Sequence, residues 1–233
     1  MNELLWIAML LANFLFILLF YRVFGKTGLY LWVPIASIVA NIQVLKLVEL
    51  FGISATLGNI VYASSFLVTD ILSELYGKKS ARRAVMIGFF SLIASMVLLQ
   101  AALWFQPSGD DWAQGHLEAV FGLLPRIVGA SLLAFLVSQL HDVWAYNFWK
   151  KKWPSRKYIW LRNNASTMVS QLLDSAIFTV VAFAGAFPLP VLMEILISTY
   201  FIKWIVAAAD TPFIYWAVRM KNKGRIPEEE PED

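Results

Sequence analysis

Acidic and basic side chains occur at isolated positions inside long apolar stretches of this sequence. Asp174 and Lys203 lie nearest to the middle of their stretches. A charge among apolar residues is costly unless it faces water or a partner of opposite charge. Consecutive antiparallel helices would bring both residues to the same depth, at about 1.5 Å of rise per residue. We therefore predict that Lys203 pairs with Asp174, either as a structural ion pair or as part of a binding site.

Polar residues recur at helical spacing in several of these stretches, so each stretch would present one polar face. The most regular face consists of Asn164, Thr167, Gln171, Asp174 and Phe178. The others consist of Ser37 and Asn41; of Asn59, Tyr62, Thr69, Asp70 and Ser73; of Ser131, Ser138, Gln139 and Asp142; and of Tyr200, Lys203, Ala207 and Asp210. Polar faces on neighbouring helices predict a lined interior cavity, which is typical of small-molecule transporters rather than of inert anchors.

Three further carboxylates are expected within two to three turns of basic segments. They belong to Asp70, Asp142 and Asp210. The arginines that could neutralise some of them are Arg82, Arg83 and Arg162. Each carboxylate therefore has a purely structural interpretation beside a functional one, and the same holds for Glu74 at the end of its helix.

The composition is that of an integral membrane protein. Of the 233 residues, 59% are hydrophobic and 15% are charged, and the mean hydropathy is +0.64. Soluble domains contain roughly 45–50% apolar and about 25% charged residues. The sequence has no cysteine and two histidines, which excludes disulfides and thiolate sites and argues against a metal site. No metal and no cofactor are expected.

Seven stretches approach or exceed the ~20 apolar residues that a membrane-spanning helix requires. They are 4–20, 28–50, 57–76, 84–105, 125–148, 164–187 and 190–218. The fold class is therefore predicted to be all-α, a polytopic helix bundle that forms one transmembrane domain over 1–226. No Ala-x-Ala site follows the first stretch, so it is expected to be retained as a helix. The acidic tail 227–233 is expected to be disordered.

Basic residues cluster on one side of the predicted bundle. Most of the 19 lysines and arginines follow the first, third, fifth and seventh stretches. The positive-inside rule makes that side cytoplasmic, with the N-terminus outside and the C-terminus inside. The basic residues are explained by the orientation of the protein in the membrane, so they do not indicate a nucleic-acid partner, and none is expected.

Four segments of the sequence form a recognisable set. The most distinctive is SSFLVTDILSELYGKKSARR at residues 64–83. The others are SQLHDV at 138–143, NAST followed by QLLDS within 164–175, and YFIK at 200–203. Together these segments resemble the queuosine precursor transporter family of the bacterial inner membrane. They occur in the family's order, and the similarity covers roughly residues 30–220.

The resemblance implies a fold and a function. The fold would be a six-helix core, similar to the substrate-binding subunits of energy-coupling-factor importers, preceded by one additional N-terminal helix. The function would be uptake of a 7-deazaguanine base for queuosine modification of tRNA. Candidate substrates are 7-cyano-7-deazaguanine, 7-aminomethyl-7-deazaguanine and queuine. Family members work without an ATPase module, so none is expected as a partner, and homo-oligomerisation stays open.

The resemblance also suggests roles for the polar residues. A deazaguanine presents an N1–H and an exocyclic amine that one carboxylate can accept together, which favours Asp174. Lys203 would donate to the carbonyl oxygen or hold Asp174 charged. Further candidates for substrate binding are Gln171, Asn164 and Asn41 as polar contacts and Tyr200, Trp204 and Phe178 as stacking partners. Candidates for gating or coupling are Asp70, Glu74, Gln139, Asp142 and Asp210.

Other function classes predict different features. An energy-coupling-factor subunit for another vitamin would need a separate ATPase module. An intramembrane hydrolase would carry a motif such as His-Glu-x-x-His, Gly-x-Ser-x-Gly or an aspartate pair of the presenilin type, and the sequence contains none of them. The protein is therefore not expected to be an enzyme. A membrane scaffold would not bind a purine analogue.

Overall fold

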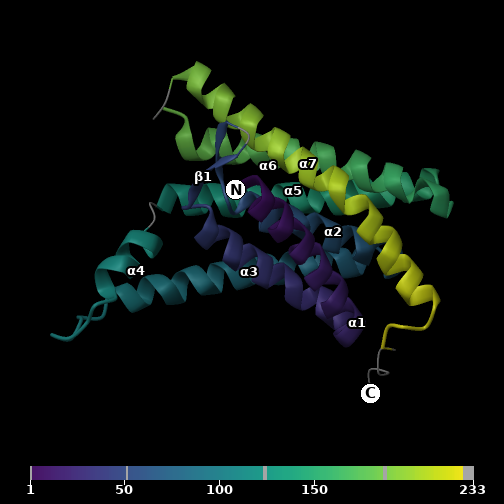
Figure 1. Cartoon of the computed structure of the whole chain (residues 1–233), viewed down its shortest axis with the longest axis horizontal. Coiled ribbons are helices and arrows are strands. Elements are labelled where there is room, and N and C mark those ends of the chain that lie inside the picture. Colours follow the sequence, from purple (N-terminus) through teal and green to yellow (C-terminus); the bar gives the residue numbers. More distant parts are fainter. Residues whose placement is uncertain (1, 51, 123–124, 186–187, 228–233) are drawn as a thin grey trace.

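The computed structural model describes residues 2–50, 52–122, 125–185 and 188–227, and these form a bundle of long helices (Figure 1). In chain order the elements are α1 (Asn2–Gln43), β1 (Leu47–Leu50), β2 (Ile53–Thr56), α2 (Asn59–Leu75), α3 (Lys78–Leu103), α4 (Gln114–Phe121), α5 (Pro125–Lys152), the 3₁₀ turn η1 (Arg156–Tyr158), α6 (Ile159–Phe183) and α7 (Leu189–Asn222). The predicted all-α helix bundle is confirmed. Apart from Pro227, the acidic tail lies outside the described residues.

The first helix, α1, folds back on itself at Gly25. The rings of Phe16 and Trp32 stack with their centroids 6.4 Å apart, whereas a straight helix would separate them by about 24 Å. Gly25 has φ 58° and ψ −140°, a non-helical conformation that favours glycine. The halves of α1 on either side of Gly25 are therefore two helices packed against each other, and they correspond to the first two predicted spans.

The two halves of α1 approach each other closely at Gly28. A Cβ atom added there would lie 2.1 Å from the backbone oxygen of Phe20. Gly28→Ala is therefore expected to force the halves apart and to destabilise the protein by about 1–3 kcal/mol. A lower melting temperature of the purified protein would show this. Gly129→Ala in α5 is the matched control, since a Cβ there meets no atom within 4 Å; equal melting temperatures of the two variants would contradict the prediction.

The second predicted span, 28–50, extends too far, because the helix ends at Gln43 and the chain then forms a β-hairpin. Strands β1 and β2 pair antiparallel, with Leu47 opposite Thr56 and Leu50 opposite Ile53. Gly52 in the turn has φ 77°, a conformation that favours glycine. Apolar content alone could not separate these short strands from the end of a helix.

Four helical segments of the described chain are long and apolar enough to cross a membrane. They are Asn2–Gln43, Lys78–Leu103, Arg156–Ala182 and Ile195–Asn222. Seven spans were predicted, and the number found is smaller partly because α1 is counted as one segment although it contains two of the predicted spans. The helix α2 has 17 residues, and α5 is interrupted by polar side chains and ends in three lysines.

Helix α2 lies at the centre of the bundle, in contact with α1, α3, α5, α6 and α7. Every residue from Asn59 to Ser73 except Tyr62 is buried, and Tyr62 is partly buried. In contrast, large apolar side chains project outward from the other long helices. Examples are Leu4, Leu15, Phe90, Leu98 and Ile197. This distribution suits a bundle surrounded by lipid, with the polar faces of its helices turned toward α2.

Candidate functional site

Asp174 of α6 lies where four helices meet. Its Oδ2 accepts a hydrogen bond from Lys203 Nζ of α7, and the two side chains form a buried ion pair. Its Oδ1 accepts hydrogen bonds from Tyr62 Oη of α2 and, at 3.1 Å, from Ser138 Oγ of α5. The predicted pairing of Lys203 with Asp174 is confirmed. We call Asp174, Lys203, Tyr62 and Ser138 the Asp174 cluster.

The Asp174 cluster combines charge with an aromatic surface. Lys203 Nζ lies 5.0 Å from the centre of the Tyr62 ring, a distance that allows a cation–π interaction. Asp174 is 3% exposed and Lys203 is 4% exposed. Removing two such charges from water costs several kcal/mol per ion, which mutual attraction offsets only when the geometry is good. The cluster can therefore present both a carboxylate and an ammonium group to a polar ligand.

Gln171 lies one turn before Asp174 on α6 and is fully buried. Neither its Oε1 nor its Nε2 has a hydrogen-bond partner among the described residues. A buried donor or acceptor without a partner costs about 1–3 kcal/mol, and such groups call for an explanation. The Gln171 side chain can therefore accept a hydrogen bond through Oε1 and donate one through Nε2 to a ligand that offers one donor and one acceptor.

A second polar cluster lies one to two turns away from the Asp174 cluster. Thr167 of α6 contacts two carboxylates, Asp70 Oδ2 at 3.1 Å and Asp142 Oδ1 at 3.2 Å. Thr69 of α2 contacts Asp142 Oδ2 and Gln139 Oε1, each at 3.3 Å. All five side chains are fully buried. The structure therefore brings together three of the five predicted gating residues, and we call this group the Thr167 cluster.

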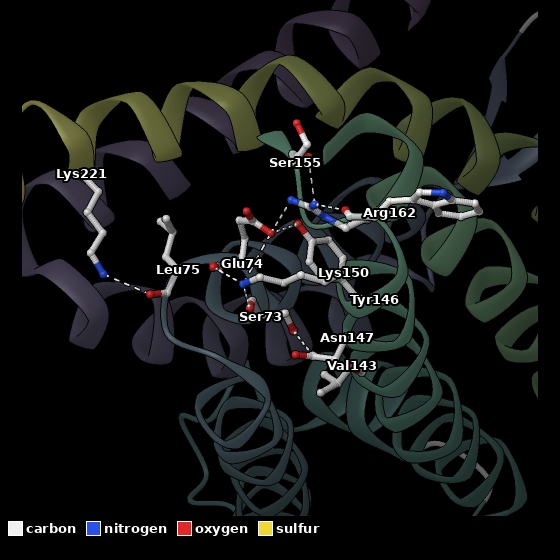
Figure 2. Close-up of polar contacts among 11 residues, drawn as sticks. Ser73, Glu74, Leu75, Val143, Tyr146, Asn147, Lys150, Ser155, Arg162 and Lys221 are labelled. Atoms are coloured by element: carbon white, nitrogen blue, oxygen red, sulfur yellow. Dashed lines mark hydrogen bonds and ion pairs between the residues drawn. The ribbon is translucent and has the colours of Figure 1, made fainter. Parts of the chain in front are cut away.

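Glu74 joins the ends of three helices (Figure 2). Its carboxylate pairs with Arg162 of α6 at 2.7 Å and with Lys150 of α5 at 3.6 Å, and it accepts a hydrogen bond from Tyr146 Oη at 3.1 Å. Arg162 is fully buried. We call Glu74, Tyr146, Lys150 and Arg162 the Glu74 clasp, which ties the end of α2 to α5 and α6.

Backbone carbonyl groups extend the clasp. Lys150 Nζ donates to the carbonyl oxygens of Ser73 and Glu74 at the end of α2. Arg162 Nη1 donates to the carbonyl oxygens of Trp153 and Ser155, at 2.7 and 3.2 Å. Carbonyl groups at a helix end lack partners within the helix. Lys150 therefore satisfies the carbonyl groups at the end of α2, and the buried Arg162 holds the segment between α5 and α6 in place.

A fourth helix is attached at the same end of α2. Lys221 Nζ of α7 donates to the carbonyl oxygen of Leu75 at 3.2 Å (Figure 2). The same ammonium group lies 3.6 Å from the centre of the Tyr76 ring, within the range of a cation–π interaction. One end of α2 thus contacts α5, α6 and α7 through charged side chains.

Comparison with known proteins connects these clusters to transport. The model of a family described as "Putative vitamin uptake transporter" matches residues 56–217, a segment that contains the Asp174 cluster, the Thr167 cluster and the Glu74 clasp. The chain belongs to this transporter family. It is 47% identical over 219 residues to a protein of Bacillus subtilis (strain 168) named "Probable queuosine precursor transporter".

That similarity covers 94% of this chain and 96% of the relative. The resemblance predicted from the four sequence segments is therefore confirmed. Membership of this family and the apolar helices together identify the chain as a multi-pass membrane protein. No solved structure shows significant similarity to it.

Three of the predicted binding residues of this transporter lie away from Asp174. Asn164 is ten positions earlier on α6, about 15 Å along the axis, and donates to Thr211 Oγ1 at 2.7 Å. Trp204 is 39% exposed and stacks on Phe201, because the residue after Lys203 points to another side of the helix. Asn41 instead contacts Ser131 of α5 at 3.1 Å.

The remaining predicted residues are close to the cluster in sequence or are paired elsewhere. Tyr200 and Phe178 are half-buried, one turn from Lys203 and from Asp174 respectively. Asp210 Oδ1 accepts a hydrogen bond from Asn163 Nδ2 at 2.6 Å. This contact makes Asn163, rather than the predicted Asn164, the α6 amide that faces the buried polar region.

The expected pairing of Asp70, Asp142 or Asp210 with an arginine is wrong. In the described part of the chain, hydroxyl and amide groups contact these carboxylates, and Arg162 pairs with Glu74 instead. The reason is position: Glu74 is one turn nearer to the helix end than Asp70 and reaches the basic segment first.

Two members of the Asp174 cluster were not among the predicted site residues. Tyr62 and Ser138 lie on the predicted polar faces of their helices, which was the only signal that could have identified them. Among the described residues, no group of three or more histidine, aspartate or glutamate side chains is arranged to hold a metal ion.

Proposed function

We propose that this protein imports a queuosine precursor, a 7-deazaguanine base such as 7-cyano-7-deazaguanine or 7-aminomethyl-7-deazaguanine. The observation that carries the proposal is the 47% identity, over nearly the whole of both chains, to a protein named as a transporter of a queuosine precursor. The buried Asp174 cluster supports it, because a deazaguanine offers groups complementary to a carboxylate and an ammonium group.

In the proposed complex Asp174 accepts hydrogen bonds from the N1–H and the exocyclic amine of the base. A carboxylate has about four acceptor positions, and rotation of the Tyr62 side chain would release the one that Tyr62 occupies. Lys203 carries three N–H donors, so it can contact the carbonyl oxygen of the base while it remains paired with Asp174. Charge-assisted contacts of this kind are the strong ones.

The proposed route runs through one transmembrane domain in the bacterial cytoplasmic membrane, with the N-terminus outside and the C-terminus in the cytoplasm. The Glu74 clasp and the Thr167 cluster then lie between Asp174 and the cytoplasm. We propose that they form the inner gate of an alternating-access cycle. The contacts of the clasp and the contact of Lys221 with Leu75 join α2 to α5, α6 and α7, so opening the gate requires these contacts to separate.

Complementation tests the proposed function. A bacterial strain that cannot synthesise the precursor and lacks its own transporter is supplied with low external 7-cyano-7-deazaguanine. Expression of this protein is expected to restore queuosine in tRNA, measured by mass spectrometry of tRNA nucleosides. An empty vector is the control. Queuosine that stays absent although the protein is present in the membrane would refute the proposal.

The family description favours one alternative, an energy-coupling-factor subunit for another vitamin. The same strain distinguishes the two functions. Import by this protein alone, without a co-expressed ATPase module, supports an autonomous transporter. Failure to import the precursor, together with uptake of another vitamin that requires a co-expressed ATPase module, supports the alternative.

A further inference from the structure

Three polar side chains without partners follow one another along α6. Gln171, Ser175 and Thr179 are spaced by four residues and therefore lie along one side of the helix. They are 0%, 0% and 2% exposed. The two amide atoms of Gln171 and the hydroxyl groups of Ser175 and Thr179 have no hydrogen-bond partner among the described residues.

The missing partners are unusual within this bundle. Buried hydroxyl groups on its helices generally donate to a backbone carbonyl three or four residues earlier. Those that do so are Ser37, Ser64, Ser65, Thr69, Ser80, Ser138, Ser166 and Ser170. Ser175 and Thr179 make no such bond. Their hydroxyl groups and the Gln171 amide together form a buried polar row that is available to a ligand.

Asp174 lies beside this row, on the neighbouring side of α6, one turn after Gln171 and directly before Ser175. The order along the helix is thus an amide, a carboxylate and two hydroxyl groups. Asp174 also contacts α2, α5 and α7, so a ligand that reaches the Asp174 cluster lies next to the row. The positions from 171 to 179 extend over roughly 12 Å of helix.

We infer that this row determines substrate selectivity, and the inference rests on the proposed function. Around a free deazaguanine base the polar groups follow one another as N9–H and N3, then the exocyclic amine and N1–H, then the carbonyl oxygen and the substituent at C7. With the amine and N1–H on Asp174, the N9–H and N3 edge faces Gln171. The carbonyl oxygen and the C7 substituent face Ser175 and Thr179.

Each end of the row then recognises one chemical feature. The Gln171 amide accepts from N9–H and donates to N3, which selects a free base over a form substituted at N9. A hydroxyl group at Thr179 donates to a nitrile or accepts from an aminomethyl group, which selects a polar C7 substituent. A site built to hydrogen-bond one group rejects analogues that lack it, because its own buried group is left without a partner.

Competition for uptake tests both ends of the row. The competitors are 7-cyano-7-deazaguanine, its N9-methyl derivative and 7-deazaguanine without a substituent, each measured against labelled 7-cyano-7-deazaguanine in cells. The wild-type protein is expected to prefer the parent base to each analogue by about tenfold or more, the equivalent of one hydrogen bond. Gln171→Leu is expected to abolish only the discrimination against the N9-methyl base. Thr179→Val is expected to abolish only the discrimination against unsubstituted 7-deazaguanine.

A matched control lies on the same helix. Ser166 is fully buried but donates to the carbonyl oxygen of Asn163, so Ser166→Ala is expected to keep both preferences. If Gln171→Leu and Thr179→Val also keep both preferences while wild-type uptake is normal, the inference is wrong and the proposed function stands. If the wild-type protein takes up none of the bases, the proposed function is wrong, and the inference fails with it.

Discussion

Asp174→Asn is expected to reduce the uptake of 7-cyano-7-deazaguanine by about a hundredfold. The asparagine side chain keeps one acceptor but loses the charge that Lys203 and the base would share. A hydrogen bond to a charged group contributes about 1.5–3 kcal/mol, and each 1.4 kcal/mol corresponds to about tenfold in affinity. Initial uptake rates, normalised to the amount of protein in the membrane, measure the effect.

A double variant separates binding from folding. Either single replacement, Asp174→Asn or Lys203→Met, leaves one buried charge without its partner, which typically costs 3–5 kcal/mol, whereas exchange of a whole buried pair for uncharged residues is often neutral. Asp174→Asn together with Lys203→Met is therefore expected to recover the wild-type melting temperature but not the uptake. Recovery of uptake in the double variant would show that the pair is structural and does not bind the substrate.

The sequence was sufficient to predict the Asp174–Lys203 pair, because the depth of a residue in the membrane follows from its position along the helix. Which side of a helix faces a neighbour does not follow from residue number. Tyr200, Trp204 and Phe178 were therefore the predicted aromatic partners, whereas the packing of α2 against α7 brings Tyr62 to Lys203. The same limit applies to Asn163 and Asn164, whose adjacent side chains point to different sides.

Hydropathy predicted the helices better than their ends. The pair of helices at the N-terminus was expected as separate spans, and Gly25 provides the reversal between them. The hairpin formed by β1 and β2 was not expected, because Leu47–Leu50 is as apolar as the end of a helix. The Glu74 clasp could not be predicted either, since it depends on which of several neighbouring carboxylates lies nearest to Arg162 in space.

A cross-link between α2 and α7 is expected to stop transport reversibly. Leu75 and Lys221 lie opposite each other at the clasp, where Lys221 Nζ donates to the Leu75 carbonyl oxygen, and neither residue belongs to the Asp174 cluster. The protein has no cysteine, so Leu75→Cys with Lys221→Cys introduces the only two thiol groups. A reducible bifunctional thiol reagent that spans the removed lysine side chain should lower uptake to the background, and reductant should restore it.

The cross-link is expected to stop transport because inward opening requires the end of α2 to separate from α7. A matched pair, Lys152→Cys with Lys157→Cys, joins two exposed positions, one at the end of α5 and one in η1, and should transport normally after the same treatment. Each single cysteine variant should do so as well. Full cross-linking of positions 75 and 221 with undiminished uptake would show that this end of the bundle stays closed during transport. The route of the substrate would then have to leave the bundle elsewhere than past Glu74.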